Sequence, residues 1–151
     1  MQRNNIPTVP LCLGLAGLVP FIWGALSVLL PDLGLAAARL IGARFVGPYV
    51  QIAYGSVILA FMSGVLWGFA TRAEGGVAGT GYALSVLPAL WAFLFVGGGP
   101  VSATMYLIFG FLGLLMLDAV FWHQGLAPPW WMKLRLMLSV VVIACLSVSV
   151  I

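Results

Sequence analysis

The sequence predicts an all-α protein: an integral membrane bundle of five transmembrane helices with a short interfacial segment after the first. Its 151 residues are 64% hydrophobic and include six Lys or Arg and three Asp or Glu residues. Soluble domains carry about a quarter charged residues, so a mean hydropathy of +1.20 indicates that lipid is the solvent. A span needs about 20 mostly apolar residues, and five such stretches fill nearly the whole chain. We therefore expect a single transmembrane domain over residues 1–151.

Five apolar stretches, separated by gaps that hold most of the charges, are the expected helices. Pro10 suits a first turn, where a missing N–H costs nothing, whereas Pro20 falls in mid-helix and should kink it. The first stretch is too long for a cleaved signal segment, so we expect it to be retained. The expected helices are residues 9–30, 48–70, 82–96, 100–122 and 133–151.

The gaps between these stretches differ in character. Residues 33–47 are too few to span and place two arginines among apolar residues, which indicates a short helix lying in the membrane interface. Residues 71–81 are polar and Gly-rich, which favours a loop. Residues 128–131 read Pro-Pro-Trp-Trp, and paired tryptophans at a membrane boundary are typical interfacial anchors. The expected anchors are Trp67, Trp130 and Trp131.

A stripe of small residues runs along the second expected helix at intervals of four. Residues four apart share one face of a helix, and small side chains there let another backbone approach closely in lipid. We expect this stripe to pack inside the protein or against a partner. It consists of Ser56, Ala60, Gly64 and Gly68.

The distribution of positive charge predicts the orientation of the chain. Loops that stay in the cytoplasm carry an excess of Lys and Arg. This places the N-terminus on the cytoplasmic side of a bacterial inner membrane and the C-terminus on the periplasmic side. The N-terminal face would hold Arg3, Arg72, Lys133 and Arg135, and the opposite face Arg39 and Arg44.

One ionisable residue lies inside a span. Asp118 stands about one turn before the end of the fourth helix, among Leu115, Leu117 and Val120. A charge at this depth is costly and needs a partner or a purpose. The fifth helix begins at the membrane face where the fourth helix ends, and Arg135 lies in its first turn. We predict an Asp118–Arg135 ion pair that fastens these two helices. The alternatives are a proton or substrate site and a contact with a partner protein or a lipid head group.

The remaining polar residues give little chemistry. His123 has no second ligand at metal spacing, so we expect neither a metal nor a cofactor. Cys12 and Cys145 should lie near opposite faces, which is out of reach for a disulfide. Trp67 and Arg72 end the second helix near Asp118, so these residues line either a polar pocket or an aromatic and basic belt. The sequence contains no P-loop, HExxH motif or nucleophile elbow, and no basic patch for nucleic acid.

Several spaced motifs resemble those of the transmembrane protein 69 family, small multi-span membrane proteins of proteobacteria and mitochondria with no assigned activity. The resemblance covers nearly the whole chain. It is carried by Asp118 and by three motifs: Pro10-x-x-Leu13-Gly14-x-x-Gly17-x-x-Pro20-Phe21, Tyr54-x-x-x-Ile58-Leu59-x-Phe61-x-x-Gly64-x-x-Trp67-Gly68, and Pro128-x-Trp130-Trp131-x-x-Leu134-Arg135-x-x-Leu138-Ser139.

The resemblance implies importance for Asp118 and Arg135, and a setting in an energy-transducing membrane. Three positions depart from the family pattern. Leu66 stands where the family often has His, Trp131 replaces a Tyr, and Ser139 replaces a Thr. Loss of the His favours a structural role over a chemical one for that part of the motif.

Three functions from different classes remain open. The first is a non-catalytic accessory or assembly subunit that docks on a larger respiratory or photosynthetic membrane complex, with membrane lipids as its other partners. The second is a small transporter or channel, for which Asp118 and Gln51 would mark the two ends of a path. The third is a membrane enzyme or a quinone- or lipid-binding protein that uses the cluster of Trp67, Asp118 and Arg135, and it requires an open pocket there. We expect the protein not to be an enzyme.

Overall fold

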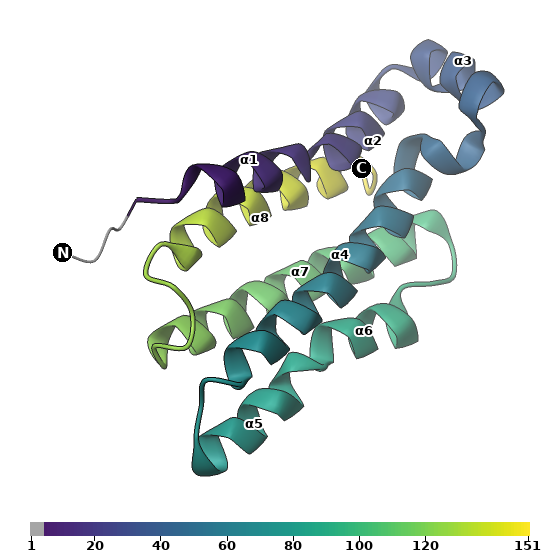
Figure 1. The fold of residues 1–151 in the computed structure, drawn as a ribbon. Coiled ribbons are helices and arrows are strands. Elements are labelled where there is room, and N and C mark those ends of the chain that lie inside the picture. Colours follow the sequence, from purple (N-terminus) through teal and green to yellow (C-terminus); the bar gives the residue numbers. More distant parts are fainter. Residues whose placement is uncertain (1–4) are drawn as a thin grey trace.

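A computed structural model describes residues 5–151 and shows helices without strands over that range (Figure 1). Five of the helical segments are long and apolar enough to cross a membrane. The all-α membrane bundle that the sequence predicts is therefore confirmed. The helices are α1 (Thr8–Ala16), α2 (Val19–Leu29), α3 (Pro31–Ile41), the short 3-10 helix η1 (Ala43–Phe45), α4 (Gly47–Ala70), α5 (Gly75–Ser85), α6 (Leu87–Phe95), α7 (Pro100–His123) and α8 (Trp131–Val148).

Two of the five spans are interrupted near a proline. The first span, Thr8–Leu29, divides into α1 and α2 just before Pro20, as its mid-helix position predicts. The third span, Gly75–Phe95, divides into α5 and α6 just before Pro88. A proline removes one backbone hydrogen bond and displaces the preceding turn. At the second break the hydroxyl of Ser63, on α4, accepts a hydrogen bond of 2.8 Å from the N–H of Ala89.

The third span begins earlier than the sequence indicates. Residues 71–81 were expected to form a loop before a helix at 82–96, but α5 begins at Gly75. Glycine weakens a helix in water, whereas in lipid each backbone N–H and C=O needs an internal partner, and a helix supplies it. Close packing also selects this helix, since a Cβ added at Gly81 would lie 3.2 Å from the Cβ of Ala70.

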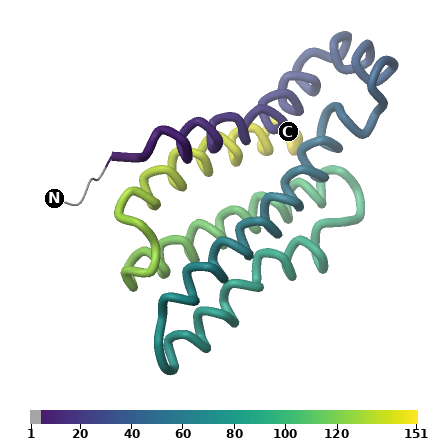
Figure 2. Tube along the Cα trace, in the orientation of Figure 1, coloured from purple at the N-terminus to yellow at the C-terminus, as the bar shows by residue number. Residues whose placement is uncertain are grey.

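The central helix of the bundle is α4, which contacts α2, α5, α6 and α7. On the other side, α8 contacts α1, α2 and α7, so α1 lies along α8 rather than along α4 (Figures 1 and 2). The hydrophobic core forms where these elements meet. Its fully buried large side chains include Phe21, Leu59, Leu66, Leu107, Phe111, Leu114, Phe121 and Leu146.

The expected interfacial segment is the helix α3, which projects from one end of the bundle (Figure 1). Asp32 lies in its first turn and Arg39 in its last, which matches each charge to the helix dipole. Gly34 is buried against α2. A side chain would not fit there, because a Cβ would lie 2.5 Å from the carbonyl oxygen of Ser27. The apolar side chains of Leu35 and Leu40 stay exposed, as they would in a helix lying on a membrane.

The small-residue stripe on α4 does not pack inside the described bundle. Ala60, Gly64 and Gly68 are exposed, and a Cβ at either glycine would meet no described atom within 4 Å. The helix instead turns a different face inward, which includes Gly55 and Leu59. Burying large apolar side chains removes more apolar surface from the surroundings than burying small ones. The face of α4 with the larger side chains therefore packs in the core, and the small-residue stripe stays exposed.

A buried amide ties three helices together at the end of the bundle nearest α3. Gln51 of α4 donates hydrogen bonds to the carbonyl oxygens of Phe21, on α2, and Cys145, on α8, at 2.9 and 3.1 Å. Its own carbonyl oxygen accepts a bond of 2.6 Å from the Ser149 hydroxyl. Gln51 is fully buried and each polar atom has a partner, so we read it as a structural fastener.

Candidate ligand pocket

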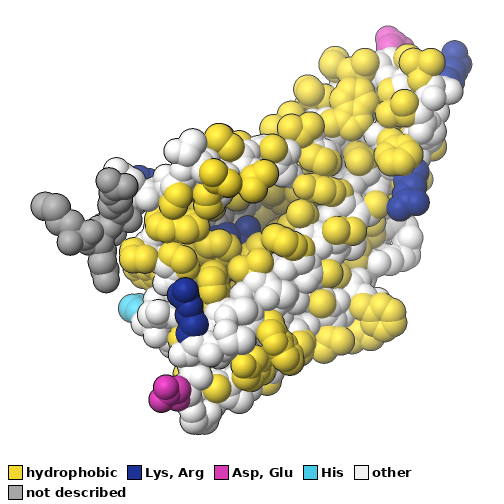
Figure 3. Space-filling model, in the orientation of Figure 1, with side chains coloured by type: hydrophobic (Ala, Val, Ile, Leu, Met, Phe, Trp, Pro, Cys, Tyr) yellow, Lys and Arg dark blue, Asp and Glu magenta, His cyan; other side chains and the backbone are white. Residues whose placement is uncertain are grey.

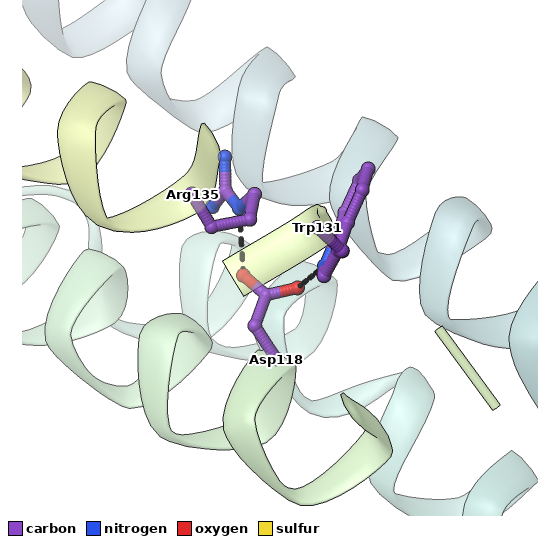
Figure 4. Close-up of polar contacts among 3 residues, drawn as sticks. All are labelled: Asp118, Trp131 and Arg135. Atoms are coloured by element: carbon purple, nitrogen blue, oxygen red, sulfur yellow. Dashed lines mark hydrogen bonds and ion pairs between the residues drawn. The ribbon is translucent and has the colours of Figure 1, made fainter. Parts of the chain in front are cut away.

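Asp118 and Arg135 form the ion pair that the sequence predicts (Figure 4). The Nε of Arg135 lies 2.7 Å from Oδ2 of Asp118, and both residues are buried. The other carboxylate oxygen accepts a hydrogen bond of 2.8 Å from the indole N–H of Trp131. Trp131 and Arg135 are four residues apart on α8, so they share one face and both reach the same carboxylate on α7.

The sequence analysis placed Trp67 in the cluster with Asp118 and Arg135. In the structure the aromatic member of the cluster is Trp131. Trp67 is 49% exposed and packs on the ring of Tyr82, away from the ion pair. Trp131 is only partly exposed and its N–H is held by Asp118, so it is more than an interfacial anchor. Both residues lie near the same end of the bundle. Position in the sequence gives the depth of a residue in the membrane, but it does not show which of the two side chains faces inward.

Two buried polar atoms beside the ion pair have no hydrogen-bond partner in the described chain. They are Nη2 of Arg135 and the hydroxyl oxygen of Ser139, and these residues are 6% and 2% exposed. Hydroxyls in transmembrane helices usually donate to the carbonyl four residues earlier, and Ser56 and Ser147 of this bundle do so. Ser139 makes no such bond, although a buried unpaired polar group is costly.

Both atoms belong to residues that line one pocket of about 510 Å³. Figure 3 shows it as a hollow among hydrophobic side chains with Lys or Arg atoms at its bottom, and Arg135 is the basic residue of its lining. The walls come from α1, α2, α4, α7 and α8 and are otherwise almost entirely apolar. They include Leu13, Phe21, Tyr54, Val57, Phe61 and Leu138.

The pocket opens sideways within the height of the bundle. Leu13, Val57 and Phe61 form part of its wall, are exposed, and belong to predicted spans. The opening exists because α1 lies against α8, where a Cβ at Gly14 would come within 2.9 Å of Leu138. After the break near Pro20 the chain continues as α2, which packs on α4 as well as on α8. The space between α1 and α4 is left to the pocket.

A second, shallower hollow of about 730 Å³ lies at the end of the bundle where α4 ends and α8 begins. Arg72, Lys133 and Trp122 line it, and all three are exposed. Arg72 donates a hydrogen bond to the carbonyl of Leu126 at 3.2 Å. Neither Asp118 nor Arg135 belongs to its lining, so this surface corresponds to the basic and aromatic belt rather than to the predicted polar pocket.

The other candidates from the sequence stay outside the pocket. Cys12 and Cys145 are free thiols, as expected from their separation. His123 is exposed and packs against the ring of Trp122. Within residues 5–151 no three His, Cys, Asp or Glu side chains come together in a group that could hold a metal ion.

The core between Asp118 and Gln51 is largely apolar, with Ser63, Thr104 and Ser139 as buried hydroxyl-bearing residues on its helices. Leu59, Leu66 and Leu107 are fully buried along this route, and the two polar side chains are each bonded within the bundle. A transporter needs a series of polar or hydrated positions across the bilayer. The described core gives the transport hypothesis no support.

Comparison with known proteins places the chain in a family. Residues 6–151 match a family model described as "Protein of unknown function (DUF3429)". The chain belongs to this family. It is also 33% identical to transmembrane protein 69 of Xenopus tropicalis over 98% of its own length. The chain spans 56% of that relative, and no solved structure matches it.

This membership confirms the resemblance seen in the sequence, and it supplies no activity. The family description and the name of the relative state only that the proteins are of unknown function and span membranes. Any function for the chain therefore rests on its own geometry.

Sequence reasoning found the ion pair but missed the pocket beside it. Ser139 lies four residues after Arg135 in an otherwise apolar helix, and that spacing could have placed both side chains on one face. Tyr54 and Leu138 carry no comparable signal. Their place in the pocket depends on how α1, α4 and α8 cross, which only the packed structure shows.

Proposed function

We propose that this protein binds a lipid-soluble amphiphile in the lateral pocket between α1, α4 and α8. The observation that carries the proposal is the pair of unpartnered donors, Arg135 Nη2 and Ser139 Oγ, at an otherwise apolar pocket. The apolar wall suits a hydrocarbon chain, and the two donors suit an acceptor-bearing head group. The role is non-catalytic, since the residues of the pocket include no nucleophile paired with a base.

The size and opening of the pocket agree with this role. Small-molecule sites are mostly apolar cavities of about 300–1,000 Å³ with a few placed polar groups, and this one measures about 510 Å³. Its sideways opening lets a molecule enter from among the lipid chains. The ion pair with Asp118 and the bond from Trp131 hold the Arg135 side chain in place before any ligand arrives.

Mass spectrometry of co-purified lipids from native membrane tests this proposal. We expect the wild-type chain to retain at least one amphiphile through detergent exchange, and Val57→Trp to lose it. Val57 lines the pocket and is 61% exposed, so a larger side chain narrows the pocket without crowding the core.

The matched control is Val140→Trp. Val140 is also 61% exposed but lies outside the pocket lining, so this variant should retain the same molecule as wild type. Identical sets of retained lipids in all three proteins would contradict the proposal.

A second role, which the open face of α4 favours, is that of an accessory or assembly subunit on a larger membrane complex. Ala60, Gly64 and Gly68 leave that face flat and exposed, which allows another helix to approach closely. A respiratory or photosynthetic complex of the bacterial inner membrane is the partner we propose. The two roles are compatible, because α4 presents the stripe and the pocket wall on separate residues.

A pull-down in mild detergent tests the subunit role. We expect the tagged chain to recover such a complex stoichiometrically and Gly64→Leu to reduce the recovery several-fold, because the added side chain blocks close approach. Gly113→Leu is the control, since Gly113 on α7 is also exposed with no described atom near its Cβ. Recovery of the chain alone would exclude this role.

The orientation with a cytoplasmic N-terminus also remains a proposal. Of the four charges assigned to the N-terminal face, Arg3 lies outside the described residues and Arg135 is buried in its ion pair. Arg72 and Lys133 then face Arg39 and Arg44 across the membrane. Labelling of single cysteines in the two loop sets by a membrane-impermeant reagent would decide the orientation.

A further inference from the structure

The lateral pocket combines a hydrogen-bonding site with a net charge of zero. Asp118 carries one negative charge and Arg135 one positive charge, and the two are 2.7 Å apart. Asp118 lies behind Arg135 and outside the lining, and apart from Arg135 the pocket lining contains no Asp, Glu, Lys, Arg or His. Any ligand therefore meets a neutral, preformed pair, and not an unpaired cation.

This balance decides which head groups fit. A carboxylate or phosphate would add a negative charge beside Asp118 in an apolar site, where an uncompensated charge is costly. A cationic head group would be repelled by the positively charged guanidinium of Arg135. A neutral oxygen that accepts hydrogen bonds leaves the charge balance unchanged and satisfies both free donors.

The spacing of the two donor residues on α8 allows one shared acceptor group. Arg135 and Ser139 are one turn apart on the same face of α8, about 6 Å along the helix axis. Long Arg and short Ser side chains from such positions can converge on a single oxygen or on adjacent oxygens. The aromatic rings of Phe21, Tyr54 and Phe111 complete the wall and offer flat apolar surfaces.

We infer that the pocket takes a long-chain molecule whose head group is a neutral carbonyl, either an acyl ester or a quinone ring. This inference rests on the proposed lipid-binding function and specifies its ligand. The carbonyl oxygen accepts hydrogen bonds from Arg135 Nη2 and Ser139 Oγ, and the chain lies against the apolar walls. Both head groups share this chemistry, and the experiment separates them.

The test is a native mass spectrometry titration of the purified full chain in a neutral detergent. Methyl oleate and oleate have the same hydrocarbon chain and differ in head-group charge. We expect methyl oleate to bind at least about tenfold more tightly than oleate at neutral pH. A benzoquinone with a decyl chain is the third probe, and binding tighter than that of methyl oleate would assign the ring carbonyl as the preferred source.

Two variants report on the donors. Ser139→Ala removes one hydrogen bond with little change in shape, so it should weaken methyl oleate binding about fivefold to tenfold. Asp118→Asn removes the charge that balances Arg135, so the ratio of affinities should move toward oleate by at least about tenfold. If Asp118→Asn does not fold, the relative affinities of methyl oleate and oleate for the wild-type protein still show whether the pocket prefers a neutral head group.

The outcomes separate this inference from the proposed function. If oleate binds wild type more tightly than methyl oleate, and Val57→Trp abolishes that binding, the pocket is real and the neutral head group is wrong. If no probe binds wild type more tightly than it binds Val57→Trp, the proposed function fails together with the inference.

Discussion

An Arg135→Met variant is expected to lose about 3–5 kcal/mol of unfolding free energy, because the Asp118 carboxylate would stay buried without its counter-charge. The indole of Trp131 would remain as its one observed partner, at 2.8 Å. The pair lies between α7 and α8, so its loss should loosen that helix contact first. Unfolding in a graded mixture of denaturing and mild detergent, followed by circular dichroism, measures the change.

A double variant shows whether the cost comes from the pair or from the charge left behind. Asp118→Leu together with Arg135→Met removes both charges, and replacing a buried ion pair by apolar residues of similar volume is often close to neutral. We expect its stability to lie within about 1.5 kcal/mol of wild type. A double variant as unstable as Arg135→Met alone would show that the ion pair itself holds the helices together.

The second large effect is expected at Gln51. Replacing it by Leu leaves the carbonyl oxygens of Phe21 and Cys145 and the hydroxyl of Ser149 without their observed partner. Unpaired buried groups cost about 1–3 kcal/mol each, and partial rearrangement should limit the total to about 2–3 kcal/mol. The same detergent unfolding experiment measures it.

Ser149→Ala provides the comparison for Gln51→Leu. It removes one of the three hydrogen bonds and leaves the amide bonded to both carbonyls, so a loss of about 0.5–1.5 kcal/mol is expected. Equal losses for the two variants would mean that the bonds to α2 and α8 contribute nothing measurable.

Most of the fold could be predicted because lipid imposes strong rules on a sequence. Four of the five spans were expected close to their observed bounds, and the break near Pro20 followed from its missing N–H. The third span was wrong at its start, because a Gly-rich segment reads as a loop in water. Bilayer-spanning backbone has to pair its own polar groups, so the same segment from Gly75 is helical.

The candidate site could be predicted in part, and for an equally physical reason. Asp118 is a costly charge in an apolar helix, and Arg135 is the cation at the same depth, so the pair followed from energetics alone. Choosing between Trp67 and Trp131 required knowing which way each ring points. The small-residue stripe was visible in the sequence, but its exposure at Gly64 and Gly68 was not.

By itself, the sequence determined that this chain is a membrane protein, how many spans it has, and which two charged residues form an ion pair. These properties depend on hydrophobicity, helix length and the cost of a lone charge, which are local in the chain. The tertiary structure alone decided that α1 packs on α8, that a pocket remains beside α4, and that Arg135 and Ser139 keep free donors there. Helix crossings depend on the shapes of side chains far apart in sequence, and no single stretch of the chain encodes them.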